Sequence, residues 1–210
     1  MRNGETSPSH PWFRPGLAIL FAVCWILSAI HPVDMGVWLL ENVLTLQAVL
    51  WVWFTRRLLP LSDLSYFLIA AFLLMHEVGA HYTYELVPIG FWIKPWFGLV
   101  RNDWDRIVHF AFGFLLVVPC YESLRRFFNG PPWLVWLAPS ILIAGMSAFY
   151  EIAEAYANLV LAPYTAAAYL SLQGDPFDSQ NDMAMAVAGS MLAMTIAALA
   201  QRRGTLSWQA

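Results

Sequence analysis

Four pairs of acidic and histidine residues stand three or four positions apart in otherwise apolar sequence. They are Glu77 and His81, Asp105 and His109, Glu151 and Glu154, and Asp178 and Asp182. Residues at this spacing share one face of an α-helix. Each pair therefore offers two metal ligands, or an acid with the histidine that orients it, and helical bundles hold divalent metals with such pairs. The alternative is that the pairs only neutralise one another between membrane helices.

Several other kinds of site are excluded or disfavoured. The histidines of His76-Glu77-Val78-Gly79-Ala80-His81 are five residues apart, about 140° around a helix, whereas a zinc-protease HExxH motif needs a spacing of four. Cys24 and Cys120 lie in separate apolar runs and form no CxxC motif. Ser179 has no recognisable base partner in the sequence, which disfavours covalent catalysis. The net charge of −3 argues against a nucleic-acid partner.

The composition is that of a membrane protein. Sixty per cent of the 210 residues are hydrophobic and 12% are charged, the mean hydropathy is +0.57, and eleven tryptophans are available for the membrane interfaces. Six segments are long and apolar enough to span a bilayer. These are Gly16–Ile30, Gly36–Phe54, Leu64–Tyr84, Arg106–Leu124, Trp133–Ala155 and Asp182–Ala200.

We therefore predict an all-α polytopic membrane protein, a six-transmembrane-helix bundle with one membrane domain over residues 16–200. Segment 1–15 and tail 201–210 are predicted to be cytoplasmic. The connection Glu85–Asp105 is expected to lie along the membrane interface, and Tyr156–Asn181 is the longest connection.

The basic residues predict the orientation. Eight of the eleven fall on the side of the termini: Arg2, Arg14, Arg56, Arg57, Arg125, Arg126, Arg202 and Arg203. Only Lys94, Arg101 and Arg106 fall on the other side. The positive-inside rule then places both termini in the cytoplasm.

The acids have the opposite distribution. On the same topology, eleven of the fourteen acids and four of the five histidines fall on the outer side or in the outer leaflet. Three basic residues cannot neutralise them, so the buried groups need a cation, protons or a basic ligand. The sequence thus predicts a polar pocket at the outer leaflet. Its predicted members are Glu41, His76, Glu77, His81, Asp105, His109, Glu151, Glu154, Asp178 and Asp182.

Roles within the pocket follow from residue type. The candidate catalytic groups are Glu77, Asp105, His109, Glu151 and Asp182. The candidate metal ligands are His76, Glu77, His81, His109, Glu154 and Asp178. Arg101 and Arg106 are candidates to hold an anionic headgroup, although anchoring at the interface is the favoured role for them. The predicted cofactor is a divalent metal ion of unassigned identity, and no organic cofactor is expected.

Several motifs together resemble one family. They are Trp38-x-x-Glu41-Asn42, His76-Glu77-x-Gly79-x-His81-Tyr82-x-Tyr84, Asp105-Arg106-x-x-His109-Phe110 with Gly113, Glu151-x-x-Glu154, and Gly174-Asp175-Pro176-Phe177-Asp178-Ser179-Gln180-x-Asp182-Met183. Over residues 30–195 the chain resembles the YjdF-type inner-membrane proteins. These are distantly similar to the VanZ-like superfamily, from whose pattern the chain departs at Glu154 and Ala186. The resemblance implies a multispan protein of the bacterial inner membrane, and it supplies a pattern of site residues without a reaction.

The leading hypothesis is an intramembrane enzyme that acts on a lipid or lipid-linked envelope substrate, with or without a metal. A bound ion or a Glu/His base would activate water, and an Asp–His pair would transfer protons. The first alternative is a transporter or carrier of protons, ions or metals that uses the same acids. The second is a scaffold in which the acids form a structural network.

Overall fold

The computed structural model describes residues 11–127, 130–157, 159–161, 165, 169–170 and 173–202. These residues form seven helices and no strand: α1 (Phe13–Ser28), α2 (Met35–Thr55), α3 (Asp63–Tyr82), α4 (Pro88–Phe97), α5 (Trp104–Phe127), α6 (Pro132–Ala157) and α8 (Asp178–Arg202). The predicted all-α class is confirmed for this part of the chain. Most of the predicted terminal segments (residues 1–10 and 203–210) and parts of the connection Tyr156–Asn181 lie outside the described residues.

Each predicted span corresponds to one helix, with ends that differ by a few residues. Five of them, α2, α3, α5, α6 and α8, are long and apolar enough to cross a membrane. Helix α1 is apolar but has only 16 residues. At 1.5 Å per residue it is about 24 Å long, slightly short of a hydrocarbon core of about 30 Å. The sixth crossing therefore depends on α1.

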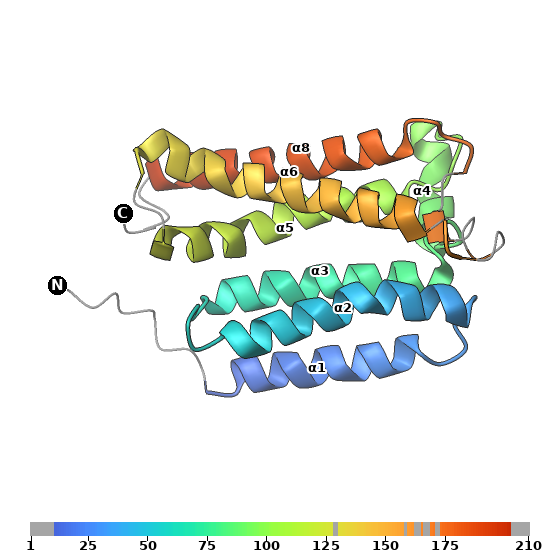
Figure 1. The fold of residues 1–210 in the computed structure, drawn as a ribbon, viewed down its shortest axis with the longest axis horizontal. Helices are drawn as coiled ribbons and strands as arrows, with labels where there is room; N and C mark the ends of the chain where they lie inside the picture. Colours follow the sequence, from blue (N-terminus) through green and yellow to red (C-terminus); the bar gives the residue numbers. More distant parts are fainter. Residues whose placement is uncertain are drawn as a thin grey trace.

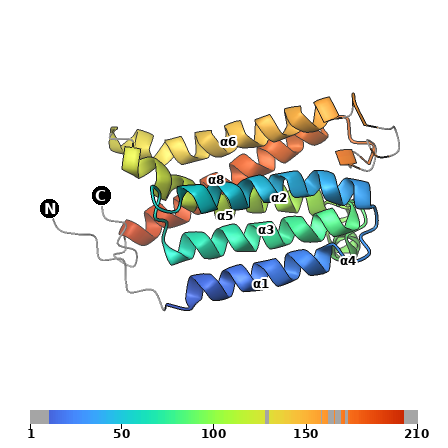
Figure 2. The same cartoon turned by 60° about the horizontal axis from the view of Figure 1, so that its bottom comes forward.

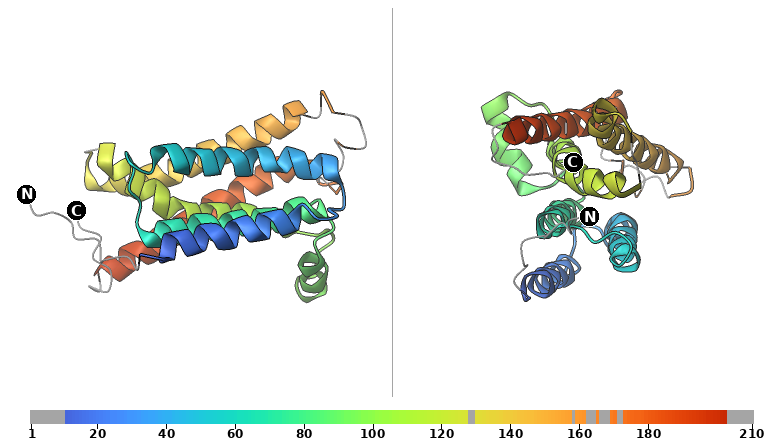
Figure 3. Two further views of the ribbon diagram at one scale, coloured as in Figure 1. Left: turned by 90° about the horizontal axis from the view of Figure 1, so that it is seen from below. Right: turned by 90° about the vertical axis from the view of Figure 1, so that its left-hand side faces the viewer.

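The long helices form two groups of three (Figure 1; Figure 3, right). Helix α3 packs against α1 and α2 in the first group, while α5, α6 and α8 pack against one another in the second. The two groups meet where α3 contacts α5. Figure 2 shows the long helices running side by side, with the start of α1 and the end of α8 at the same end of the bundle. The short helix α4 lies across the opposite end (Figure 3, left).

Helices α5 and α8 make the most extensive contact in the bundle because two glycines face the partner backbone. A Cβ atom on Gly113 would lie 1.8 Å from the carbonyl oxygen of Ala186. A Cβ on Gly189 would lie 2.2 Å from the carbonyl oxygen of Phe110. Small residues at such positions let membrane helices approach closely. His109 and Asp182 lie one turn before Gly113 and Ala186, so this contact brings the two side chains together.

The connection Glu85–Asp105 contains α4, a helix that the sequence analysis did not predict. Pro88 occupies its first turn, and Gly98 ends it in the left-handed conformation (φ 62°). Both are the usual residues for these positions. Helix α3 likewise ends at Tyr82, two residues before the predicted end, because Thr83 and Tyr84 adopt positive φ angles of 57° and 56°.

Asn102 connects the loops at this end of the bundle through hydrogen bonds. Its side-chain amide donates to the carbonyl oxygens of Glu85 (2.9 Å) and Val87 (3.0 Å). Its backbone N–H donates to Oε1 of Gln173 at 2.9 Å, and Nε2 of Gln173 donates back to the Asn102 carbonyl at 2.9 Å. The loop before α5 is thus held to both α4 and the segment before α8.

Candidate functional site

A cavity of about 630 Å³ lies between α2 and α6, with α3 and α5 at its back. Its apolar lining is Leu40, Val43, Leu44, Phe72, Val108, Phe112, Ile141, Leu142, Gly145, Met146, Phe149 and Ala153. Its polar lining is Glu41, Gln47, His76, Tyr84, Asp105, His109, Ser147, Tyr150, Glu154 and Tyr169. Two lining residues, Val43 of α2 and Phe149 of α6, are 52% and 74% exposed. The cavity therefore opens sideways between two membrane-spanning helices.

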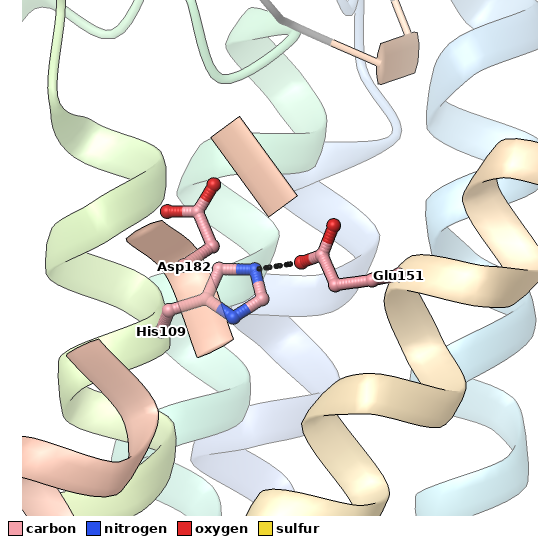
Figure 4. A group of neighbouring side chains, drawn as sticks. All are labelled: His109, Glu151 and Asp182. Atoms are coloured by element: carbon pink, nitrogen blue, oxygen red, sulfur yellow. Dashed lines mark ion pairs between the residues drawn. The ribbon is translucent and has the colours of Figure 1, made fainter. Parts of the chain in front are cut away.

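His109, like Asp105, lines the cavity and also belongs to the polar groups between α5, α6 and α8. Its Nε2 lies 3.3 Å from Oε1 of Glu151 on α6 (Figure 4). The same nitrogen lies 3.6 Å from Oδ1 of Asp105 on its own helix. Its Nδ1 lies 3.5 Å from the hydroxyl of Ser147. Nε2 therefore faces carboxylates from two helices, and Nδ1 faces a hydroxyl.

Asp182 of α8 lies beside His109 and Glu151 (Figure 4). One ligand atom from each of His109, Glu151 and Asp182 lies within 4.8 Å of the others. The same holds for Asp105, Asp178 and Asp182. Asp182 is 2% exposed, and its buried Oδ1 accepts no hydrogen bond from any described residue. Two overlapping groups of ligand-type side chains therefore share Asp182.

Arg101 and Arg106 form ion pairs with neighbouring acids. Arg101 pairs with Asp178, and its Nε lies 3.3 Å from Oδ1 of Asp103. Arg106 pairs with Asp175, and its Nη1 lies 3.4 Å from the same oxygen of Asp103. Neither arginine lines the cavity. Their predicted role as holders of an anionic group stays a prediction, since the partners seen here are carboxylates.

Glu41 of α2 and His76 of α3 both line the cavity. Nε2 of His76 lies 3.1 Å from the carbonyl oxygen of Glu41, and Nδ1 lies 2.6 Å from the Tyr84 hydroxyl. A carbonyl only accepts, so Nε2 carries a proton and neutral His76 accepts from Tyr84. Burial, aided by the carboxylates of Glu41 and Asp105, raises the pKa of Tyr84 well above its ordinary value, which keeps that donor protonated. The Tyr150 hydroxyl donates to Oε2 of Glu41 at 3.1 Å.

Glu77 and His81 make hydrogen bonds away from the cavity. The hydroxyls of Thr45 and Ser28 donate to the two oxygens of Glu77 at 2.6 and 2.8 Å. Nδ1 of His81 lies 2.8 Å from the carbonyl oxygen of Ser28. Neither residue lines the cavity or belongs to the two groups of ligand-type side chains. These bonds connect α3 to α1 and α2.

The ten predicted pocket residues thus divide into three sets. Asp105, His109, Glu151, Asp178 and Asp182 lie together between α5, α6 and α8. Glu41, His76 and Glu154 line the cavity beside them. Glu77 and His81 lie beyond His76. Ser147 and Tyr150 were missed, although Ser147 precedes Glu151 by four residues and the helical period places both on one face.

Comparisons with known proteins identify the family of this chain. The family described as "Predicted membrane protein (DUF2238)" matches residues 14–203. This chain belongs to the DUF2238 family. It is also 33% identical over 176 residues to the inner membrane protein YjdF of Escherichia coli (strain K12), a match that covers 83% of each chain. No solved structure matches. Together with the five long apolar helices, membership of DUF2238 and the likeness to YjdF support a multi-pass protein of the inner membrane.

Proposed function

We propose that this DUF2238 protein is a membrane-embedded enzyme that acts on a lipid or lipid-linked envelope substrate. The observation that carries the proposal is the cavity between α2 and α6, which has apolar walls, a sideways opening and acids with histidines at its back. Its volume of about 630 Å³ lies within the roughly 300–1,000 Å³ of ligand sites. An acyl chain suits the walls, and a polar headgroup suits the end near Asp105 and Tyr84.

Acid–base chemistry is the reaction class that these residues support. Asp105 and His109 line the cavity, and Glu151 lies 3.3 Å behind His109. A carboxylate next to Nε2 stabilises the imidazolium that forms when His109 takes a proton from water or from a substrate hydroxyl. Asp105 is placed to exchange the same proton because it lies 3.6 Å from the same nitrogen.

A transporter is a weaker alternative because the described residues place few polar side chains toward the other end of the bundle. There the carboxylate of Glu122 accepts from the backbone N–H (2.9 Å) and the hydroxyl (2.6 Å) of Ser62. A buried apolar cluster that includes Val117, Ile143 and Met194 lies between α5, α6 and α8. A through-path needs polar lining on both sides of the membrane.

The proposed topology has six crossings in the bacterial inner membrane, with α1 as the sixth and both termini in the cytoplasm. The cavity then faces the periplasmic leaflet, where α4 lies along the interface. The arginines at the ends of α2, α5 and α8 support this orientation. The distant similarity to the VanZ-like superfamily stays a prediction.

A photoreactive lipid tests where the substrate enters. The protein is placed in nanodiscs of phosphatidylethanolamine and phosphatidylglycerol that carry a diazirine in one acyl chain. We expect crosslinks at cavity residues such as Val43 and Phe149, mapped by mass spectrometry. Gly145 lines the cavity, and a Cβ atom added to it would meet nothing within 4 Å, so Gly145→Phe should fill the space and abolish these crosslinks.

The control is Gly16→Phe, because Gly16 of α1 also has open space at its Cβ position but does not line the cavity. Crosslinks that persist unchanged in Gly145→Phe would exclude lipid entry between α2 and α6. Chemistry is then tested by lipid mass spectrometry after incubation with total envelope lipids. A product made by the wild-type protein should fall by roughly 10²–10⁴-fold in Asp105→Asn, the usual contribution of general acid–base groups. The absence of any product would favour a non-catalytic role.

A further inference from the structure

The side chains His109, Glu151 and Asp182 have the composition and arrangement of a metal site. They come from three helices, α5, α6 and α8, and are 8%, 6% and 2% exposed. Their ligand atoms lie within 4.8 Å of one another. Bonds from zinc to nitrogen and oxygen are about 2.0–2.2 Å, so neighbouring ligands of a tetrahedral ion are about 3.4 Å apart. Small side-chain adjustments would bring all three atoms onto one ion.

The unpartnered oxygen of Asp182 is the second observation that points to a ligand. Oδ1 of Asp182 is fully buried and accepts no hydrogen bond from the described part of the chain. Leaving a buried carboxylate oxygen without a donor is costly, and more so when the group is charged. Glu77 is equally buried but differs, because hydroxyls donate to both of its oxygens. Oδ1 of Asp182 therefore lacks a hydrogen-bond donor, and a bound cation would take that place.

The local charge balance points the same way. Four carboxylates, those of Asp105, Glu151, Asp178 and Asp182, lie in the two overlapping groups. Arg101 pairs with Asp178, whereas Arg106 pairs with acids outside the groups, Asp103 and Asp175. One guanidinium cannot neutralise four carboxylates, and burial makes an uncompensated negative charge costly. A divalent cation would supply the missing charge.

We propose that His109 Nε2, Glu151 and Asp182 bind one divalent transition-metal ion, with Asp105 and Asp178 completing or supporting its coordination. One imidazole with several carboxylates suits Mn²⁺, Fe²⁺ or Zn²⁺ better than Cu⁺, which prefers sulfur ligands. The Ser147 hydroxyl at Nδ1 is placed to fix the ring, as outer-shell partners do at metal-bound histidines. Because Asp105 and His109 also line the cavity, the ion would lie just behind its wall, where it would activate a bound water. With Nε2 bound to the ion, Asp105 would replace His109 as the group that takes the proton.

This assignment deepens the proposed function but is tested without any lipid. Wild-type protein purified in detergent is analysed for metal content, both as isolated and after chelation and reloading with Mn²⁺ or Zn²⁺. We expect one equivalent per chain and a saturable Mn²⁺ signal in electron paramagnetic resonance titrations. Asp182→Asn should weaken binding by more than the roughly 10–100-fold that loss of an outer-shell partner causes.

The matched control is Glu77→Gln, a change in an equally buried carboxylate whose oxygens already have donors. It should retain the ion. Loss of metal in Glu77→Gln with retention in Asp182→Asn would place the ion near His76 and His81 instead and overturn the assignment. If Asp182→Asn does not fold, the wild-type titration decides, because the absence of saturable binding overturns the proposal. Lipid crosslinking in the cavity is a separate measurement, so either proposal can fail alone.

Discussion

At the scale of single residues, the site depends on hydrogen bonds that fix which groups are free to react. His76 is held between a carbonyl and a tyrosine hydroxyl, and Glu77 is held by two hydroxyls. His109 instead presents Nε2 to carboxylates. Residue type alone made all three candidate metal ligands, whereas their hydrogen-bond partners single out His109 as the histidine available for chemistry.

Ser147 provides a test of how His109 is positioned. Ser147→Ala removes the hydroxyl that lies 3.5 Å from Nδ1, so the ring loses an orienting partner. We expect divalent-metal affinity to fall by about 10–100-fold, as for other outer-shell changes, with little change in the unfolding temperature. Competition with a chromogenic chelator measures the affinity. Ser140→Ala, a buried serine two turns earlier on α6, is the control, and equal losses in both variants would contradict this role.

Asp175 gives a pH-dependent prediction. Its oxygens accept from the backbone N–H of Phe177 (2.9 Å) and from Nδ2 of Asn181 (3.0 Å), and these bonds with the nearby arginines hold its pKa below the ordinary 3.8. A depressed folded-state pKa favours folding above about pH 4, and this contribution disappears as pH falls through the folded-state value.

Asp175→Asn should therefore lower the unfolding midpoint at neutral pH, and the difference from wild type should shrink as the solution becomes strongly acidic. Thermal unfolding in detergent at a series of pH values measures it. A difference that does not vary with pH would mean that the carboxylate charge is not what stabilises the loop before α8.

At the scale of elements, the α5–α8 contact is what brings the acids of separate helices together. Gly113→Ala would place a Cβ 1.8 Å from the Ala186 carbonyl, so the helices must separate. We expect destabilisation of about 1–3 kcal/mol or more, the range for overpacked interiors, together with weaker metal binding because Asp182 moves from His109. Gly145→Ala is the control, since nothing lies within 4 Å of its Cβ position. Unfolding in a series of SDS concentrations compares the two variants. If Gly113→Ala is as stable as Gly145→Ala, the α5–α8 contact is not as close as the structure shows.

The six long helices were predictable from the sequence because long apolar runs define them, and their ends differ by only a few residues. The short helix α4 was not predicted. The partners across helices were not. Spacing pairs Asp105 with His109, yet Glu151 from another helix is closer to Nε2, at 3.3 Å against 3.6 Å. That contact depends on how closely α5, α6 and α8 pack, which apolar periodicity does not encode. The pairing of Arg106 with Asp175, 69 positions away, is hidden for the same reason.

At the scale of the whole molecule, the two ends of the bundle differ in charge. The start of α1 and the ends of α2, α5 and α8 carry arginines, while the acids gather near α4. We expect the α4 end to face the periplasm. Trp96 of α4 and Phe127 at the end of α5 are 85% and 75% exposed, so cysteines there are comparably accessible. In intact cells a membrane-impermeant maleimide should label Trp96→Cys and spare Phe127→Cys. The reverse pattern would show that the protein has the opposite orientation in the membrane.

The number of crossings fixes the side on which the N-terminus lies, so the role of α1 can be tested in the same way. If α1 crosses, Trp12 lies on the same side as Phe127; if only the five longer helices cross, it lies on the side of Trp96. Trp12 is 72% exposed, so Trp12→Cys is accessible on either topology. We expect protection in intact cells and labelling after permeabilisation, because Arg14 pairs with Asp63 at 2.6 Å and thereby ties the start of α1 to the start of α3. Labelling of Trp12→Cys in intact cells would mean that only the five longer helices cross the membrane and that α1 lies along its surface.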